Sequence, residues 1–396
     1  MTTKHVYIDC DSHITPADAM DYLGDEMAHL KPVVTYDSEG RHASTHFPAG
    51  WPSGGWTEVL GFTPGIDLAG SGGKHDGLYN VDFRVYELDK MGIDLQMLVS
   101  QFSPWAWSYL VEPKLAAAMA HSFNTSLLRI IERHPDRFFG AALVPLQDVP
   151  AAIRELEWAH ANGFKVAVSD EIFPSREHPF GDPLGTREEL WPFFAKCEEL
   201  GMPVFLHRIQ HGHRIVNVPI FQKFGLDIFA PNDTHVTLAS LVTSGLLDDF
   251  PNLKIVKPES GTGWIKPFLE RLDSVFAGDS SVDYTNTQVR SPRVLPPGSR
   301  SLVLPELASE RNKKPPSYYF KRNFWFAIET EEEELPEAVR FLGAERFLFA
   351  TDYPHDDPGG RMKYEDVKLF EANTGIPEPE KELIRSGNAK QLFRLD

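Results

Sequence analysis

Residues 5–13 read HVYIDCDSH, a short apolar run that ends in two aspartates and a histidine. Residues 347–355 read FLFATDYPH, a second apolar run that ends in an aspartate and a histidine. Both runs have the length of a buried β-strand, and carboxylates and imidazoles are common metal ligands. Because the two runs lie near opposite ends of the chain, they can share one site only if the first and last strands meet, as they do in a closed barrel.

The spacing within the first run predicts which side chains share a face. Side chains two residues apart in a β-strand point the same way, so we expect Asp9, Asp11 and His13 to point into one space as the strand ends. The alternative is a helix that begins near Pro16, with an aspartate or serine as its N-cap and His13 in a loop. The pattern of the remaining chain favours the strand.

Short apolar or β-branched runs alternate with longer stretches that have helical spacing. The strand-like runs cover residues 5–11, 94–100, 138–145, 164–170, 202–208, 253–260, 322–329 and 347–354. The helix-like stretches between them include residues 114–133, 151–161, 187–200, 236–250, 264–276 and 332–342. Alternation of this kind predicts parallel βα units, and eight of them predict an α/β fold of the (β/α)8 TIM-barrel type.

The length of 396 residues exceeds that of a usual domain, but such barrels reach it with insertions. Residues 1–396 are therefore predicted to form one domain, with insertions at about 23–77 after the first strand and about 277–316 before the seventh. The second insertion is Pro-rich and basic, so it is either an arm of a homodimer, which we expect, or a solvated loop. Trp56 and Trp105 are candidates to bind a bulky substrate, with core packing as the alternative.

The charge and cysteine content restrict the partners and the compartment. A formal net charge of −18 disfavours nucleic acid and anionic membranes, so the expected partner is a small-molecule substrate. The cysteines are Cys10 and Cys197 only, which is typical of a reducing compartment. No signal-peptide-like segment and no apolar run long enough to span a bilayer is present, so a cytoplasmic protein is predicted.

Four of the predicted strands end in residues of the kinds that bind metals. They are Asp11 and His13 on the first strand, His207 on the fifth, Glu259 on the sixth and Asp352 on the eighth, with His355 close behind. The active site of such a barrel lies at the C-terminal ends of the strands, so a metal site is predicted there. Singly, each has a plainer explanation, as a core histidine, a helix-start carboxylate or a turn residue; the coincidence at four strand ends favours the metal.

Several motifs along nearly the whole chain resemble one known family. They are Asp9-x-Asp11-x-His13, Leu206-His207, residues 250–256 leading into Glu259-x-Gly261-x-Gly263-Trp264, residues 269–273, Asp352-Tyr353-Pro354-His355 and residues 387–390. Together they resemble the amidohydrolase superfamily, in particular the branch with aminocarboxymuconate-semialdehyde decarboxylase and related aromatic-acid decarboxylases.

The resemblance implies a divalent metal held by Asp11, His13, His207 and Asp352. The family pattern on the first strand is His-x-His, whereas this chain has Asp11 at the first position and, on the sixth strand, Glu259 where many relatives have a histidine. We therefore count Glu259 among the candidate ligands. More oxygen donors favour Mn²⁺ or Fe²⁺ over Zn²⁺. No lysine ends the fourth strand, so a carbamylated-lysine bridge between two zinc ions is not indicated.

Two reactions need the same constellation. In a hydrolase, Asp352 accepts a proton from a metal-activated water while His207 or His355 polarises the scissile carbonyl. In a decarboxylase, the metal binds the substrate carboxylate and Asp352 protonates the ring carbon. Arg208 is a candidate to pair with a substrate carboxylate, with a surface position as the alternative.

A third possibility comes from a different class of enzyme. Mixed carboxylates and imidazoles are what oxygen-activating diiron centres use, so a diiron monooxygenase on this barrel, acting on a bulky apolar substrate with an electron-transfer partner, is the alternative. The predicted cofactor is accordingly a divalent ion, iron, manganese or zinc, with one or two per chain.

Overall fold

The fold is that of a computed structural model. The described residues are 5–16, 18–19, 21–31, 33–36, 42–46, 76–78, 80–100, 112–173, 182–207, 234–277, 312–355 and 365–395.

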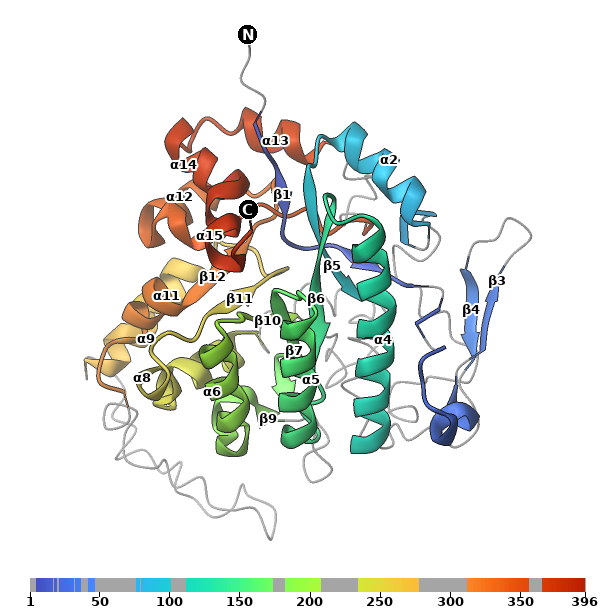
Figure 1. Cartoon of the computed structure of the whole chain (residues 1–396). Helices are drawn as coiled ribbons and strands as arrows, with labels where there is room; N and C mark the ends of the chain where they lie inside the picture. The colour runs from blue at the N-terminus through green and yellow to red at the C-terminus, as the bar shows by residue number, and fades with distance from the viewer. Residues whose placement is uncertain are drawn as a thin grey trace, which may run out of the picture.

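Eight parallel strands form the centre of the molecule (Figure 1). In order around the sheet they are β1 (Ile8–Asp9) with its continuation β2 (His13–Ile14), β5 (Leu95–Ser100), β6 (Phe138–Leu143), β7 (Val166–Asp170), β10 (Val204–His207), β11 (Ile255–Lys257), β12 (Phe324–Ala327) and β13 (Phe347–Leu348). Each strand lies beside the next in sequence, as in a (β/α)8 barrel. The eight predicted strands are confirmed, but each is shorter than predicted, and residues 322–323 of the seventh prediction lie in the preceding helix.

Contacts between the first and last strands nearly close the barrel. The Cys10 amide donates to the Phe349 carbonyl (2.9 Å), and Ser12 forms a parallel bridge with Tyr353. Beyond the end of β13, the Asp352 amide donates to the carbonyl of Asp11 (3.0 Å). Residues 5–13 and 347–355, the two runs that end in candidate metal ligands, therefore lie side by side.

Helices follow the strands and cover the outside of the barrel. They are α2 (Val81–Met91), α4 (Pro113–Arg133), α5 (Val149–Ala161), α6 (Trp191–Leu200), residues 234–243, α8 (Leu246–Asp249), α9 (Ile265–Phe276), α11 (Pro316–Asn323) and α12 (Leu335–Leu342). Side-chain caps start several of them; Asp148, for example, accepts the Ala151 amide at the start of α5 (2.9 Å). The predicted helix 236–250 is divided at Gly245, which has a left-handed φ of 87°.

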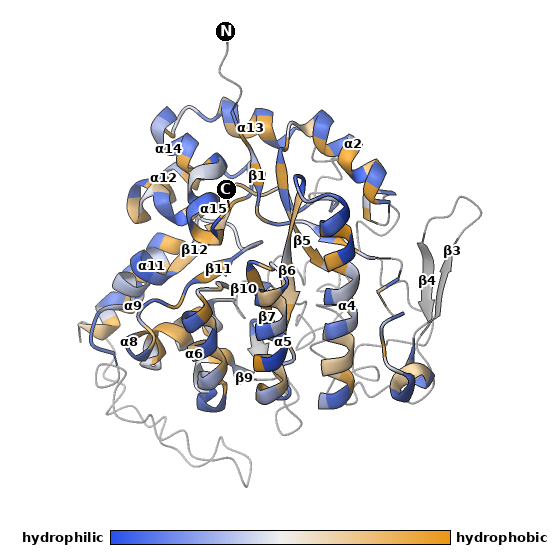
Figure 2. Cartoon of the chain, in the orientation of Figure 1, coloured by the Kyte–Doolittle hydropathy of each residue, from blue (hydrophilic) through white to orange (hydrophobic). Residues whose placement is uncertain are grey.

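The strand residues alternate between two buried layers. One set packs together inside the barrel and includes Met97, Val99, Ala141, Val168 and Phe205. The other set, which includes Leu98, Ala167 and Leu206, packs beneath helix residues such as Leu127 and Leu156. Figure 2 shows the strands mostly in hydrophobic colours and the helices in both. This alternation, typical of a barrel, fixes which residues reach the mouth.

The C-terminal segment covers the opposite end of the barrel. It consists of α13 (Asp366–Ala372), α14 (Glu378–Glu382), a π-helical turn η8 (Leu383–Gly387) and α15 (Asn388–Phe393). The Phe393 ring lies 5.5 Å from that of Phe139 at the start of β6, and the Asn388 amide donates to the carbonyls of Ala344 and Phe347 (2.8 Å each). The C-terminal segment thus covers the N-terminal end of the barrel, and the C-terminal ends of the strands lie at the other end.

The predicted insertions fall largely outside the described residues. The described part of the first contains a short helix η1 (Asp25–Leu30) and an antiparallel hairpin of β3 (Val33–Tyr36) and β4 (His42–His46), which lies to the side of the barrel in Figure 1. A second small hairpin pairs β8 (Ile172–Phe173) with β9 (Asp182–Pro183). In the described segments no helix has both the length and the apolarity that crossing a membrane requires.

Candidate metal centre at the barrel mouth

The residues predicted at four strand ends gather in one place. Asp11 lies two residues beyond β1, His13 begins β2, and His207 is the last residue of β10. Glu259 lies two residues beyond β11, and Asp352 lies four residues beyond β13. Because parallel strands end at the same edge of a barrel, these separate stretches of sequence deliver their side chains to the same mouth.

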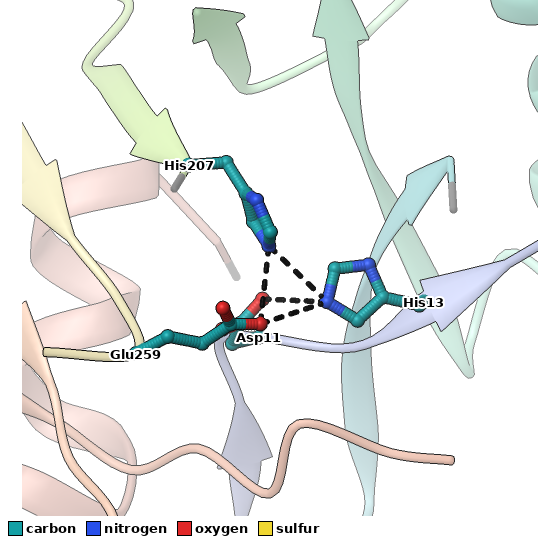
Figure 3. Close-up of side chains that lie close together, drawn as sticks. All are labelled: Asp11, His13, His207 and Glu259. Carbon is teal, nitrogen blue, oxygen red and sulfur yellow. Dashed lines mark hydrogen bonds and ion pairs between the residues drawn. The ribbon is translucent and has the colours of Figure 1, made fainter. Parts of the chain in front are cut away.

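His13 is at the centre of the group (Figure 3). Its Nε2 lies 3.3 Å from Glu259 Oε1, 3.2 Å from His207 Nε2 and 3.8 Å from Asp11 Oδ1. His207 Nε2 is also 3.3 Å from Glu259 Oε1. One ligand atom from each of the four residues lies within 4.8 Å of the other three, which is the separation expected for donors around one ion.

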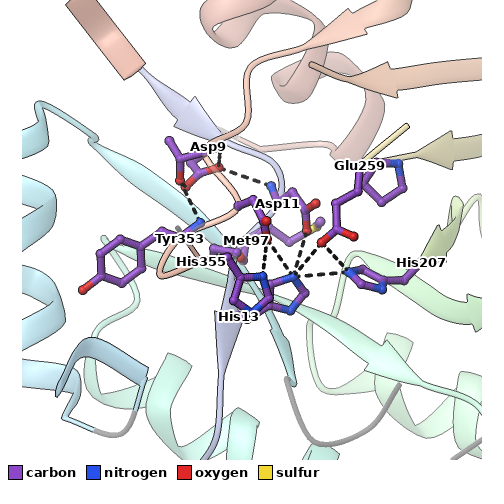
Figure 4. A network of polar contacts seen from close by, with 12 residues as sticks. Asp9, Asp11, His13, Met97, His207, Glu259, Tyr353 and His355 are labelled. Atoms are coloured by element: carbon purple, nitrogen blue, oxygen red, sulfur yellow. Dashed lines mark hydrogen bonds and ion pairs between the residues drawn. The ribbon is translucent and has the colours of Figure 1, made fainter. Parts of the chain in front are cut away.

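Asp352 and His355 extend the group, and Figure 4 shows His355 beside His13. Asp352 Oδ1 lies 3.1 Å from His13 Nε2 and 2.9 Å from His355 Nδ1. The His355 ring stacks on that of His13 with centroids 4.5 Å apart. The side chain of His13 is only 1% exposed, whereas Asp352 is 20% and His355 15% exposed. With Glu259, which is 14% exposed, Asp352 and His355 are the less buried members of the cluster.

Two of the carboxylates come from residues with unusual backbone geometry. Glu259 has a φ of 45° and Asp352 a φ of 53°, and within the described segments Arg394 is the only other non-glycine residue with a positive φ. The left-handed region is unfavourable for residues with a Cβ, by about 1–3 kcal/mol, and such residues cluster at functional sites. The strain at these two positions coincides with carboxylates that point into the cluster.

The electrostatics of the cluster are those of crowded carboxylates held by imidazoles. Burial raises the pKa of Asp11 well above its ordinary value, and the nearby charge of Glu259 adds to the shift. Burial alone would also raise the pKa of Glu259, but the charge of His207 and the hydrogen bond with His13 outweigh it and hold this pKa well below its usual range.

The pKa of His13 is raised to about 10. Burial lowers it, but the hydrogen bonds with Asp352 and Glu259 have the larger combined effect. Asp352 behaves in the opposite way: burial raises its pKa, while His355 and His13 outweigh burial and leave it below its ordinary value. At neutral pH Asp352 is therefore ionised.

The donor set fits a divalent metal ion. Asp11 Oδ1 is a buried acceptor without a hydrogen bond in the described part of the molecule, where the contacts of Asp352 Oδ1 are with the imidazoles of His13 and His355. Nor does any described lysine or arginine form an ion pair with Asp11, Glu259 or Asp352. Buried acceptors of this kind are costly unless a cation neutralises them. The candidate donors form two groups of four that share His13 and Glu259: one adds Asp11 and His207, and the other adds Asp352 and His355.

Asp9 does not join the cluster, so this part of the sequence prediction is wrong. The first barrel strand is interrupted between β1 and β2, which breaks the two-residue alternation after Asp9. The Asp9 carboxylate instead accepts from Gln96 Nε2 (2.7 Å) and from the amide and hydroxyl of Thr351 (2.9 and 2.6 Å). Sequence reasoning gave Gln96 and Thr351 no role, and no spacing signal marks them.

Three predicted substrate contacts, Arg208, Trp56 and Trp105, lie outside the described residues. Lys257, the last residue of β11, does not join the cluster, because its Nζ pairs with Glu171 Oε1 at 2.8 Å.

The barrel and the histidine–carboxylate cluster at its mouth define a class of metal-binding (β/α)8 enzymes. A family model described as amidohydrolase matches residues 8–395. The chain therefore belongs to the amidohydrolase family.

Curated relatives in this family are decarboxylases. Gamma-resorcylate decarboxylase from Polaromonas sp. is 29% identical over 329 residues, which cover 80% of this chain and 87% of the relative. The 2-amino-3-carboxymuconate-6-semialdehyde decarboxylase of Dictyostelium discoideum is 24% identical over 326 residues, or 80% of this chain and 77% of the relative.

Solved structures share the fold. An amidohydrolase from Mycobacterium avium subsp. paratuberculosis superposes with a TM-score of 0.73 at 20% identity, covering 99% of this chain and 100% of the other. A dihydroxybenzoic acid decarboxylase from Polaromonas sp., solved with bound manganese and the inhibitor 2-nitroresorcinol, has a TM-score of 0.67 at 22% identity, covering 99% and 97%.

Proposed function

We propose that this protein is a metal-dependent decarboxylase that removes the carboxylate of an aromatic or similarly unsaturated acid. The observation that carries the proposal is the match over 80% of the chain to relatives that are decarboxylases. A third such relative is the 6-methylsalicylic acid decarboxylase of Penicillium expansum. The names of these relatives share a carboxylate on an unsaturated carbon skeleton, so we expect an acid of this kind as the substrate.

The metal would be held by Asp11, His13, His207 and Asp352, with Glu259 as a further oxygen donor. Three carboxylates among five donors favour a hard ion, and we propose manganese, the ion bound in two decarboxylases of the same fold. When bound, the ion would orient the substrate carboxylate and draw electron density from the ring.

Asp352 is the residue proposed to move the proton. It is ionised at rest, and it lies on the exposed side of the cluster with His355 Nδ1 at 2.9 Å. As the acid binds, Asp352 accepts the proton of a neighbouring substrate hydroxyl. When the bond between ring and carboxylate breaks, carbon dioxide leaves and the electron pair stays on the ring carbon, to which Asp352 returns the proton. His355 holds the Asp352 carboxylate in place throughout.

Hydrolysis uses the same residues and is the competing reaction within the family. The diiron monooxygenase alternative has no support from the relatives named here.

The test is to incubate the manganese-loaded protein with hydroxybenzoates and, separately, with esters and amides of the same acids. We expect carbon dioxide and the corresponding phenol from the free acids, and a loss of roughly 10²- to 10⁴-fold in rate for Asp352→Asn. Cleavage of the esters or amides without release of carbon dioxide would instead assign hydrolysis.

A further inference from the structure

A chain of buried polar side chains connects the first barrel strand with β5 and α2. It runs from Asp9 on β1 through Gln96 on β5 to Arg84 on α2, and the exposed fraction of each of the three residues is 0%. None of them has a part in the proposed chemistry. Three polar or charged residues this deeply buried need a reason to be there.

Asp9 connects the strands that carry the metal-ligand candidates. Its Oδ1 accepts the amide of Thr351 (2.9 Å) and, at a longer distance, that of Asp11 (3.3 Å), while its Oδ2 accepts the Thr351 hydroxyl (2.6 Å). Thr351 immediately precedes Asp352. The Asp9 carboxylate thus holds the backbone beside one ligand on each of two strands.

Arg84 holds the same region from the helix side. Its Nη1 donates to the carbonyl oxygen of His13 (2.5 Å), and its Nη2 donates to the hydroxyl of Ser12 (2.7 Å). Its guanidinium also lies over the ring of Tyr353, with Cζ 4.6 Å from the centroid. These contacts flank Asp11, His13 and Asp352 without touching their ligand atoms.

Gln96 joins the two ends, and its orientation is fixed by hydrogen-bond polarity. Arg84 Nε donates to Gln96 Oε1 (2.7 Å), and Gln96 Nε2 donates to Asp9 Oδ2 (2.7 Å). Arginine can only donate and an ionised aspartate can only accept, so an amide with one group of each kind is suited to the position between them.

We propose that Asp9, Gln96 and Arg84 are positioning residues that fix the strand-one and strand-eight ligands of the metal centre in their binding geometry. The inference rests on the metal site of the proposed function. Partners that orient metal ligands from behind commonly change metal affinity by roughly 10- to 100-fold when they are removed. The three residues bind the backbone next to the ligands at three points: the Asp11 amide, the His13 carbonyl and the Thr351 amide.

The polarity of the chain allows a swap experiment. In Asp9→Asn, the new amide nitrogen faces either the two donors at Oδ2, Gln96 Nε2 and the Thr351 hydroxyl, or the two donors at Oδ1, the amides of Thr351 and Asp11, so a donor loses its acceptor in either orientation. In Gln96→Glu, two carboxylates face each other in a buried site. In the double variant Asp9→Asn/Gln96→Glu, Arg84 pairs with the carboxylate at 96, which also accepts from the amide at 9. The match of donor and acceptor between positions 84, 96 and 9 is restored, and the Thr351 hydroxyl loses one acceptor.

The measurement is the Mn²⁺ dissociation constant, obtained by electron paramagnetic resonance of free and bound manganese, beside thermal unfolding of each metal-free variant. The matched control is Asn388→Leu, which removes a buried amide that bridges two carbonyls at the opposite end of the barrel. Thr351→Val is a milder variant that removes one hydrogen bond to Asp9 and serves if the charge changes prevent folding.

We expect each single variant to weaken Mn²⁺ binding roughly 10- to 100-fold, the double variant to recover most of it, and Thr351→Val to weaken it by a smaller factor. Asn388→Leu should lower the unfolding temperature with unchanged affinity. The proposal is overturned if the single variants fold and bind Mn²⁺ as the wild type does. If they do not fold, it is overturned by a Thr351→Val variant that binds Mn²⁺ as the wild type does. Wild-type protein that binds no Mn²⁺ would instead overturn the proposed metal site itself, so the two failures are distinguishable.

Discussion

Two groups of charged side chains are buried near the C-terminal end of the barrel, and they differ in how fully their atoms are paired. In the first, Lys257 pairs with Glu171 at 2.8 Å and donates to the carbonyl of Pro258 (2.5 Å). Both Glu171 oxygens also accept from the Thr234 hydroxyl (2.9 and 3.0 Å). In the second, the cluster at the mouth, Asp11 Oδ1 has no hydrogen bond in the described part of the chain, and the contacts of Asp352 Oδ1 are with imidazoles instead of a lysine or arginine.

The difference separates a structural ion pair from a binding site. A buried pair whose polar atoms are all satisfied needs nothing further, and removing one partner leaves a costly lone charge. A buried group of three carboxylates that lacks lysine and arginine partners among the described residues needs a cation from outside. Changes in the first group should therefore affect stability, and changes in the second should affect metal binding.

The largest expected effect is on metal content, in the variant His13→Ala. His13 Nε2 lies within 3.8 Å of Asp11, Glu259, His207 and Asp352, so its loss removes the central donor of the cluster. We expect bound metal to fall to background by elemental analysis, with the fold retained by circular dichroism. His121→Ala, which removes a half-exposed histidine paired with Glu155, is the control and should keep its metal. Full metal content in His13→Ala would remove the distinction between the two groups.

The next effect is on stability, in Lys257→Met. It leaves Glu171 buried without its cation, and we expect the free energy of unfolding to fall by about 3–5 kcal/mol while metal content stays the same. Denaturant unfolding of the metal-free protein measures this. The double variant Lys257→Met/Glu171→Gln should be more stable than Lys257→Met, because no lone charge remains. A Lys257→Met variant that keeps its stability but loses its metal would assign Lys257 to the site instead.

A smaller, graded effect is expected from pH. The pKa of His13 is raised to about 10 in the metal-free protein, so this histidine carries a proton at neutral pH. A metal must displace that proton, and affinity should therefore rise with pH, by roughly tenfold per unit for one proton released, until the pH passes the His13 pKa. Manganese titrations between pH 6 and 9 measure the slope. An affinity that does not change over this range contradicts the assignment of His13.

The smallest effect is predicted for an exposed ion pair. Lys266 and Glu337 form a contact of 2.7 Å on the surface, where water competes with the pair. Lys266→Ala should leave both the metal content and the unfolding midpoint within error of the wild type. A clear loss of either quantity would show that burial is the wrong criterion for comparing these groups.

The residues at the strand ends could be predicted because their location follows from one fact alone, that each lies at the end of a strand in a parallel barrel. Asp11, His13, His207, Glu259 and Asp352 all follow or end apolar runs, and the topology brings such positions together. Asp9 could not be placed in the same way. Its role depends on an interruption in the first strand, which the apolar and polar pattern of residues 5–13 does not reveal.

Helix α2 was also missed, for a physical reason. Its buried face carries Arg84 and Glu87, two charged residues that in a sequence resemble a solvated surface rather than a core face. Both are satisfied inside the protein: Arg84 by Gln96 and backbone carbonyls, and Glu87 by the hydroxyl of Tyr353. Partners this far apart in the chain are visible only once the fold is known.

The most direct test of the central claim is elemental analysis of the purified protein, with manganese, iron and zinc counted per chain and an absorption spectrum recorded in air and after anaerobic reduction. We expect one divalent ion per chain, manganese by preference, and no oxygen-sensitive absorption. A folded protein without metal, or one with two irons and an absorption band that changes with oxygen, would contradict it.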